Sequence, residues 1–262
     1  MAAPVPETPM VNAGLLYVSG LQLSNDATTP LTLLDVAAGA CRDSTNTNDI
    51  VVSSAVVVNL AGTGALGIDT GTVAASTMYA VYAVGSSTNQ IGNGQPVSAY
   101  PGTVLLSLSF TQPTLPFNYD MFRRIGTVVT DSSSHILAFR QDGSGQNRRM
   151  TYATPIATAI TAGNATTNTS VVINTTPTVP AIATLVHFSI GLTPTTAGNK
   201  VILVPTGAGA SDIYAQLSGD VAAVVHTDAL SCPCSATPQV SYRVTAGGDA
   251  VAISVQGFDD LL

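Results

Sequence analysis

The stretch Gly39-Ala-Cys-Arg-Asp-Ser-Thr-Asn-Thr-Asn-Asp-Ile-Val-Val-Ser-Ser-Ala-Val-Val-Val-Asn-Leu60 indicates the fold class of the whole chain. Its first half is dense in Asn, Asp, Ser and Thr, whose side chains hydrogen-bond to their own backbone and favour turns. Its second half is rich in β-branched residues, which favour strands. One charged pair, Arg42 and Asp43, stands where the turn begins. A polar turn followed by a β-branched run is the pattern that the rest of the chain repeats.

In the first half of the chain, short apolar runs are broken at short intervals by turn residues, as expected for a β-sandwich or barrel. The run Val104–Phe110 alternates apolar residues with serine, which predicts a strand buried on one face only. The polar stretch between Gly85 and Gly102 predicts a long exposed loop. The predicted strands are 15–23, 31–36, 50–60, 78–84, 104–110 and 124–129, and 136–139 closes a hairpin after a turn at 131–134.

In the second half, the same reasoning predicts strands at 185–192, 200–205, 213–217, 221–225, 239–245 and 250–255. The sequence therefore predicts an all-β chain of two β-sandwich, jelly-roll-like domains. Three prolines at the start predict an extended N-terminal arm over residues 1–12. The polar, glycine-containing stretch Gln141–Asn147 predicts a boundary or hinge, which gives an N-terminal domain over 13–147 and a C-terminal domain over 148–262.

The composition limits the class of protein. Only 9% of the residues are charged and 45% are hydrophobic, with a mean hydropathy of +0.36, so we expect other subunits to cover much of the surface. The net charge of −7 argues against a nucleic-acid partner, because phosphate binding needs a basic face. The three cysteines leave at least one unpaired, which fits assembly in a reducing cytoplasm. No apolar run approaches the roughly 18 residues of a membrane span, so no membrane partner is expected.

Two glycine-containing stretches could be either simple turns or functional motifs. Gly62–Gly67 matches a dinucleotide-binding fingerprint, but the residues after it cannot start a convincing helix, so a turn is favoured. Asp69-Thr70-Gly71 is the tripeptide of aspartic proteases, which need two such carboxylates. The chain holds no second copy of that tripeptide, and a turn is again favoured. No cofactor is predicted.

The histidines and cysteines could form a hydrolase or a metal site. His135, His187 or His226 could pair with a serine and an aspartate, although no nucleophile motif accompanies them. His226 could bind a metal with Cys232 and Cys234, but a fourth ligand is lacking at a recognised spacing. His187 lies in an apolar strand and is expected to be packed or hydrogen-bonded. The sequence therefore predicts neither a catalytic nor a metal site.

Five of the eight basic residues lie close together in this acidic chain. They either form a solvated rim or pair with aspartates across a subunit boundary, where the guanidinium fork binds carboxylates in bidentate fashion. Together with the charged pair of the opening stretch, they give a predicted partner interface of Arg42, Asp43, Arg123, Arg124, Arg148 and Arg149. Arg140 is the fifth member of the cluster.

Five phrases follow one another along the first half of the chain. They are Gly20-Leu-Gln-Leu-Ser-Asn-Asp26, Ala38-Gly-Ala-Cys-Arg-Asp-Ser-Thr-Asn46, Gly67-Ile-Asp-Thr-Gly71, the aromatic run Tyr79–Tyr82, and Tyr119–Gly126 with Arg123-Arg124-Ile125-Gly126. In this order they resemble the N-terminal module of structural proteins in tailed-bacteriophage particles, over roughly residues 12 to 155. The sequence departs from that module with Ile68 in place of leucine, and its second half shows no matching phrase.

The resemblance implies a virion component without catalysis, assembled in the bacterial host cytoplasm. The short chain, the lack of a heptad or collagen-like shaft and the charge-poor composition favour a capsid decoration or cement protein. We expect it to associate with itself as a homotrimer and to bind the major capsid protein. The alternative is a tail fibre or receptor-binding protein that binds tail proteins and contacts a host surface receptor. A hydrolase or glycan-active enzyme is the third hypothesis.

Overall fold

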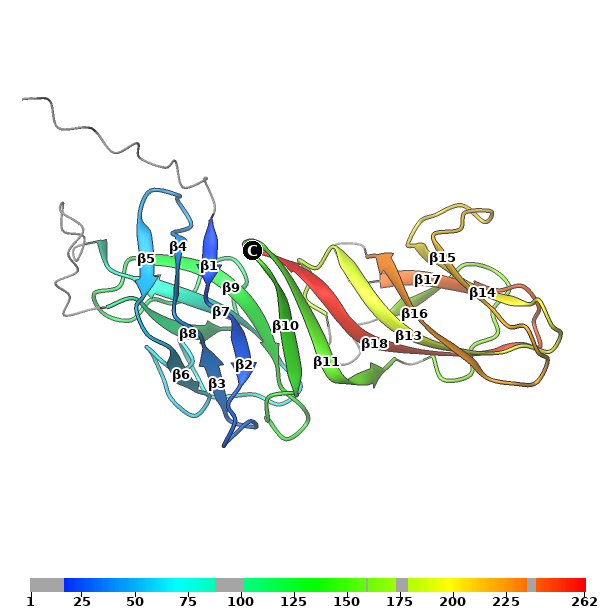
Figure 1. Ribbon diagram of the computed structural model, residues 1–262, viewed down its shortest axis with the longest axis horizontal. Coiled ribbons are helices and arrows are strands. Elements are labelled where there is room, and N and C mark those ends of the chain that lie inside the picture. The colour runs from blue at the N-terminus through cyan, green and yellow to red at the C-terminus, as the bar shows by residue number, and fades with distance from the viewer. Residues whose placement is uncertain (1–16, 88–100, 159, 173–178, 235–238) are drawn as a thin grey trace, which may run out of the picture.

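The computed structural model describes residues 17–87, 101–158, 160–172, 179–234 and 239–262. Within these ranges the chain forms strands β1 to β18, and no α-helix is present. All pairings between the named strands are antiparallel. The all-β prediction is confirmed. Figure 1 shows an elongated molecule with the N-terminal strands at one end and most of the C-terminal strands at the other.

One eight-stranded sheet runs through both halves of the chain (Figure 1). Its middle is the hairpin β10–β11, which is flanked on one side by C-terminal strands and on the other by N-terminal strands. In spatial order the strands are β16 (His226–Pro233), β13 (Leu185–Thr193), β18 (Ala250–Leu261), β11 (Asn147–Ala157), β10 (Phe139–Ser144), β2 (Leu23–Asn25), β3 (Leu33–Val36) and β6 (Val56–Asn59).

Three smaller sheets complete the fold. Two lie in the N-terminal half: β1 (Val18–Gly20), β4 (Gly39–Arg42) and β5 (Asp49–Val52) in one, and β8 (Thr103–Ser107), β7 (Met78–Gly85) and β9 (Met121–Val129) in the other. The third lies in the C-terminal half, with the order β12 (Thr169–Val172), β17 (Gln239–Val244), β14 (Lys200–Pro205) and β15 (Ala215–Ser218).

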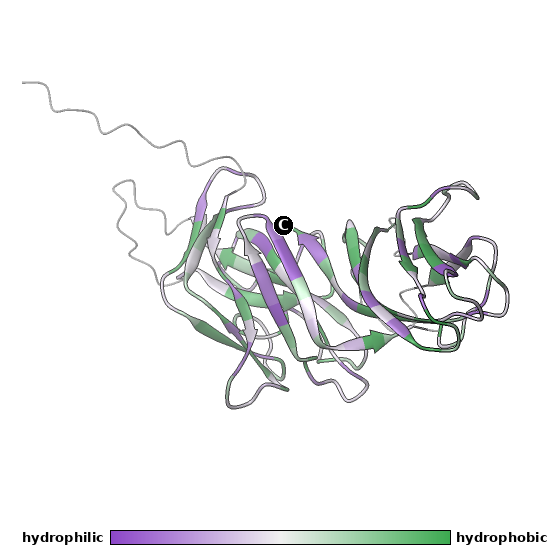
Figure 2. Cartoon of the chain, turned by 45° about the vertical axis from the view of Figure 1, so that its right-hand side comes forward, coloured by the Kyte–Doolittle hydropathy of each residue, from purple (hydrophilic) through white to green (hydrophobic). Residues whose placement is uncertain are grey.

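Two large hydrophobic clusters and one small cluster hold these sheets together. The C-terminal cluster includes Phe188 and Phe258 and is built from inward-facing residues of β13, β18, β14 and β17. The N-terminal cluster includes Leu34 and Tyr79 and joins strands from three sheets. The small cluster, around Tyr82, lies on the other face of β7. Figure 2 shows hydrophobic residues alternating with hydrophilic ones along many of the strands.

Most of the predicted strands are confirmed within a few residues. Strand β14 has the predicted bounds, and β13 and β17 each differ from prediction by one residue. In β18 the predicted alternation is present, since Val251, Ile253 and Val255 are buried and Ala252 is exposed. Period-two patterns were therefore reliable where one face of a strand meets a core and the other faces outward.

The prediction of a strand over 104–110 that is buried on one face was wrong in two respects. Strand β8 ends at Ser107, and all five of its residues are buried. The cause is that both faces of the β8-β7-β9 sheet are covered, one by the N-terminal core and the other by the small cluster. The next apolar residue, Leu108, is 58% exposed rather than part of a buried face.

Two valine-rich runs were also misassigned. The run 50–60 forms two strands in different sheets, β5 and β6, with the chain turning between them. The run 221–225 is a turn in which Ala223 has a φ of 59°, and the strand follows it as β16. β16 was missed because it is an edge strand with few buried residues, so its apolar pattern is weak.

The stretch Gln141–Asn147 does not form a hinge but the end of the paired hairpin β10–β11. Gly143 and Gly145 have φ values of 95° and 61°, which a turn requires and other residues rarely adopt. The glycines that suggested a boundary therefore serve a tight turn. The predicted arm at 1–12 and most of the predicted loop between Gly85 and Gly102 lie outside the described residues.

Candidate functional site

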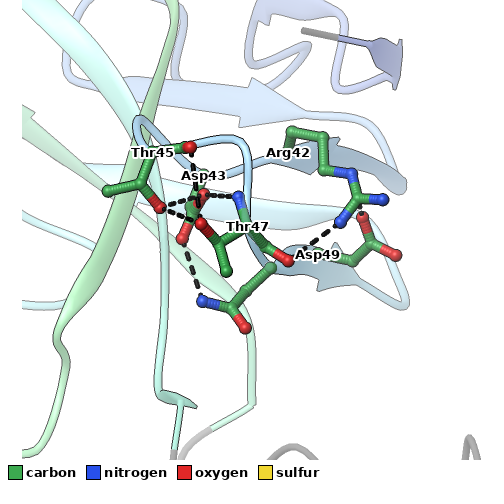
Figure 3. Close-up of polar contacts among 6 residues, drawn as sticks. Arg42, Asp43, Thr45, Thr47 and Asp49 are labelled. Carbon is green, nitrogen blue, oxygen red and sulfur yellow. Dashed lines mark hydrogen bonds and ion pairs between the residues drawn. The ribbon is translucent and has the colours of Figure 1, made fainter. Parts of the chain in front are cut away.

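Two of the predicted interface residues lie where the turn between β4 and β5 begins: Arg42 is the last residue of β4 and Asp43 follows it (Figure 3). The carboxylate of Asp43 accepts hydrogen bonds from the Thr47 backbone N–H at 2.9 Å, the Thr45 hydroxyl at 2.9 Å and the Asn48 amide at 3.1 Å. Burial raises the pKa of Asp43, but these hydrogen bonds outweigh it and bring the pKa below its ordinary value. Asp43 therefore organises the turn from within.

Replacing Asp43 tests this role through the pH dependence of stability. The folded-state pKa lies below the unfolded value of about 3.9, so ionised Asp43 stabilises the fold above that pH. This contribution is lost as the pH falls through the folded-state pKa. We expect the free energy of unfolding, measured by urea titration between pH 5 and pH 2 (approximate limits chosen around that value), to fall less steeply for Asp43→Asn than for the wild type. Asp228→Asn, at an exposed carboxylate, is the control, and equal slopes for Asp43→Asn and wild type would contradict this role.

Arg42 also makes its contacts within the turn. Its Nε atom lies 3.3 Å from Asp49 Oδ1, and its Nη1 donates to the Thr47 carbonyl at 3.0 Å (Figure 3). The side chain of Asp49 is 45% exposed, so solvent screens this ion pair. Arg42 is thus the more accessible of the two predicted residues, while Asp43 is only 3% exposed.

The second group of predicted residues lies where β9 meets the end of β18. Arg124 donates to Asp260 Oδ1 at 2.5 Å and also to the Leu261 carbonyl. Asp260 Oδ2 accepts from the Thr127 hydroxyl at 3.0 Å, and the Asp260 side chain is only 2% exposed. A buried carboxylate with two donors from another sheet joins the C-terminal strand to the N-terminal half of the same chain.

Arg123 and Arg148 are buried at the same junction. Arg123 donates to the Leu262 oxygen at 3.1 Å. Arg148 donates to Gln22 Oε1 at 2.6 Å and to the Gly20 carbonyl at 2.7 Å, so it connects β11 with the segment between β1 and β2. Burial lowers the pKa of both guanidinium groups. The structure gives both arginines partners within the chain, at 8% and 2% exposure.

Arg149 begins a row of polar side chains on the outer face of the eight-stranded sheet. Its Nε lies 2.9 Å from Asp259 Oδ1, which also lies 2.9 Å from His187 Nε2. His187 Nδ1 lies 2.6 Å from the Ser231 hydroxyl. Burial raises the pKa of Asp259, but its contacts with Arg149 and His187 outweigh it and lower the pKa overall. The row crosses β11, β18, β13 and β16.

The structure thus brings together Ser231, His187 and Asp259, the three residue types that a hydrolase of the kind considered above would need. Asp259 is shared with Arg149, which already neutralises it. A cleft of about 380 Å³ beside this row is lined by Arg149 and Asp259 but not by His187 or Ser231. His187 and Ser231 are directly opposite in the β13–β16 pairing, so we interpret the row as a cross-strand ladder of the sheet.

The cleft itself contains both signs of charge. Each of its arginines is bonded to a partner in the chain, Arg148 to main-chain and side-chain oxygens and Arg149 to Asp259. The donors of both guanidinium groups are therefore already engaged within the chain. The lining residues are Asp142, Gly143, Asn147, Arg148, Arg149, Thr184, Asp259, Asp260 and Leu261.

The other candidate motifs have local partners. Gly62–Gly67 forms a turn, as predicted, with the Gly67 backbone N–H donating to the Gly64 carbonyl at 3.0 Å. Asp69 accepts from the backbone N–H groups of Thr70 and Thr114. His226 Nε2 contacts the Val221 backbone. In the part of the chain that the structure describes, no group of three or more His, Cys, Asp or Glu side chains is placed to hold a metal ion.

Exposed apolar side chains are the feature that the sequence analysis missed. Phe117 is 85% exposed, Val225 61% and Ile213 58%. Each lies in a segment outside the regular strands, so no periodic pattern marks its orientation. Phe117, between a proline and an Asn-Tyr pair, could have been suspected from its turn-like neighbours alone.

The fold and these contacts define an all-β protein in which every arginine donates to an oxygen of its own chain. Comparison with known proteins adds little: no family model matches the chain, and no curated protein matches it. Among solved structures, the capsid protein VP2 in the subviral particle of infectious bursal disease virus is aligned at 11% identity. The alignment covers 94% of this chain and 70% of that one with a TM-score of 0.17, too low to support an argument. Among the described residues, no helix is long and apolar enough to cross a membrane.

Proposed function

We propose that this chain is a non-enzymatic structural component of a tailed-phage virion, which decorates the capsid surface and bridges capsomers. The resemblance to phage structural modules is the basis of the proposal. As part of it, residues 13–147 form the virion module and residues 148–262 form a jelly-roll-like sandwich that assembles as a homotrimer. The hairpin that contains this boundary belongs to the sheet that both halves share.

One observation supports the resemblance more than any other. Gly20 and Gly39, which belong to the first and second phrases, are paired opposite one another in the β1–β4 ladder. A Cβ atom on Gly20 would lie 2.3 Å from the Ala38 carbonyl oxygen, and one on Gly39 would lie 2.3 Å from the Ser19 carbonyl oxygen. No residue but glycine fits either position, so the two phrases depend on each other.

The remaining phrases contribute to the same core. Leu21, Cys41, Ile68, Tyr79 and Ile125, one from each of the five phrases, are fully buried in the N-terminal hydrophobic cluster. Residues that are far apart in the sequence therefore meet in one folded unit. This is what a module shared between proteins requires, because all five phrases then contribute to a single core.

A capsid-surface role also agrees with the surface chemistry. Three of the six predicted interface residues, Arg123, Arg124 and Arg148, bond across the junction of the two halves. These arginines are thus occupied within the chain, while several large apolar side chains are exposed on the surface. Contact with a shell would then gain mainly from apolar burial, at roughly 25 cal/mol per Å² before ordering costs.

Quantitative mass spectrometry of purified particles tests the proposal. For a decoration protein we expect hundreds of copies of this chain per particle, because the shell repeats its binding site by symmetry. A count between about three and a few dozen would place the chain in the tail or at a unique vertex. Absence from the particle would overturn both structural hypotheses.

The tail fibre alternative is favoured by one feature of the C-terminal half. Ile213, Tyr214, Val221 and Val225 are exposed on the loops before and after β15, far from the module that the resemblance covers. An end with exposed apolar loops suits contact with a host surface receptor. The copy number distinguishes this alternative from the decoration role.

A further inference from the structure

The segment from Leu108 to Asp120 covers the outer face of the β8-β7-β9 sheet. Its side chains Phe110, Leu115 and Tyr119 pack against the small cluster around Tyr82. The hydroxyl of Tyr82 donates to the Ser109 carbonyl at 2.9 Å and so ties the segment to β7. The segment is therefore an integral part of the fold.

Phe117 stands out from this segment. It is 85% exposed, more than any other large apolar residue among the described ones. The turn that presents it is fixed: Asn118 has a φ of 66°, the Tyr119 backbone N–H donates to the Pro116 carbonyl at 3.1 Å, and the Tyr119 hydroxyl donates to the Pro101 carbonyl at 3.2 Å. Because the backbone of this turn is already fixed, little conformational entropy of the backbone is lost when a partner buries Phe117.

Two carboxylates are tied to the segment that carries Phe117. No charged residue occurs in the sequence between Asp69 and Asp120. Asp69 accepts from the Thr114 backbone N–H at 2.8 Å, and Asp120 accepts from the Ser87 backbone N–H at 2.6 Å. Thr114, the partner of Asp69, precedes Phe117 by three positions, and Asp120 follows Phe117 by three. Phe117 is thus an apolar side chain whose segment is bonded to a carboxylate before it and carries one after it, an arrangement that resembles the core and rim of a protein interface.

A second copy of this chain offers little complementary charge. The chain has seven arginines and one lysine, and all seven arginines donate to oxygens of their own chain. Lys200 is the one basic side chain in the described ranges that donates no such bond. The basic side chains that would complement these carboxylates are therefore expected on a different protein.

We propose that the Phe117 turn is the docking point for a partner protein, and that Phe117 enters an apolar pocket rimmed by Lys and Arg side chains of that partner. This inference rests on the proposed function insofar as the partner is a virion protein. The chemistry of the pocket is independent of that identity. Opposite charges across the rim speed association and fix the orientation, while the aromatic side chain supplies the affinity.

A photo-reactive benzoylphenylalanine at position 117 of the full chain, expressed during infection, identifies the partner by mass spectrometry of the cross-linked peptides. We expect cross-links to apolar residues of another protein that have Lys or Arg within a few positions. The same photo-reactive residue at Ile213, which is 58% exposed in the other half of the molecule, should give a different set of cross-links. Cross-links from position 117 that are confined to this chain, or the absence of any, would overturn the proposal.

The result separates this inference from the proposed function. A basic-rimmed partner that is not a virion protein would keep the docking point, while the copy number per particle tests the virion role separately. The purified partner then allows a binding measurement, in which we expect Phe117→Ser to weaken binding by roughly 30-fold, while Leu31→Ser, at another exposed apolar residue, leaves it unchanged. We also expect the association rate to fall as salt is raised. Equal affinity for Phe117→Ser and wild type would show that the turn is not the docking point.

Discussion

Asp260→Ala lowers the free energy of unfolding by about 3 to 5 kcal/mol, the largest loss that we expect from any single change of a charged residue in this chain. The Asp260 carboxylate is 2% exposed and binds Arg124 and Thr127 of β9. Its removal leaves a guanidinium group that is only 11% exposed without its counter-ion, and such an uncompensated charge costs more than the pair contributes. Urea unfolding, followed by circular dichroism, measures the loss.

Two companion variants make the result specific to this ion pair. Asp142→Ala breaks the pair with Arg140, whose side chain is 78% exposed, and should cost less than about 1 kcal/mol. Adding Arg124→Met to Asp260→Ala removes the unpaired charge and should recover part of the loss. A loss for Asp260→Ala no larger than for Asp142→Ala would show that the C-terminal strand is not held by this contact.

Arg148→Met lowers the free energy of unfolding by about 3 kcal/mol, because it leaves three oxygens without their donor. Those oxygens are the Gly145 carbonyl at 3.1 Å, Gln22 Oε1 at 2.6 Å and the Gly20 carbonyl at 2.7 Å. Arg148 is 2% exposed, so water cannot replace the lost hydrogen bonds. The measurement is again the midpoint and slope of urea unfolding.

Arg148→Lys distinguishes the charge from the shape of the side chain. A lysine keeps the charge but cannot reach three oxygens with a planar fork, so we expect a loss close to that of Arg148→Met. Arg140→Met, at an exposed arginine of the neighbouring strand, is the control and should change stability by less than about 1 kcal/mol. If Arg148→Lys is as stable as the wild type, a positive charge alone is sufficient to stabilise the fold at this position, and the prediction is wrong.

Local patterns in the sequence predicted the strands well where one face of a strand is buried. The alternation in Ala250–Val255 and the apolar run Lys200–Pro205 both correspond to real strands. Patterns failed where the environment is set by distant residues: β8 is buried on both faces only because the Leu108–Tyr119 segment folds over it. No window centred on β8 contains that information.

The same reasoning explains the predicted interface residues. The cluster of arginines was visible in the sequence, but its partners Asp259 and Asp260 lie more than 100 positions away. Asp43 was noticed as one of a charged pair, whereas its hydrogen bonds to Thr45, Thr47 and Asn48 make it a turn residue. Local sequence patterns show where charged residues cluster, but which distant residue each one contacts depends on the topology of the fold.

The shared sheet also determines how the molecule responds to a pull along its long axis. The two halves are linked through hydrogen-bonded strands, so tension is transmitted as shear across the ladder. β10 and β11 are joined over six residue pairs, but β10 and β2 share only the pair Arg140 and Ser24. The buried Gln141 reinforces that narrow seam, since its Oε1 accepts from the Leu23 N–H at 2.9 Å and its carbonyl accepts from the Gln22 amide at 2.7 Å. We therefore expect β10 and β2 to separate before the other neighbouring strands of this sheet when the molecule is stretched. This seam lies inside the N-terminal half.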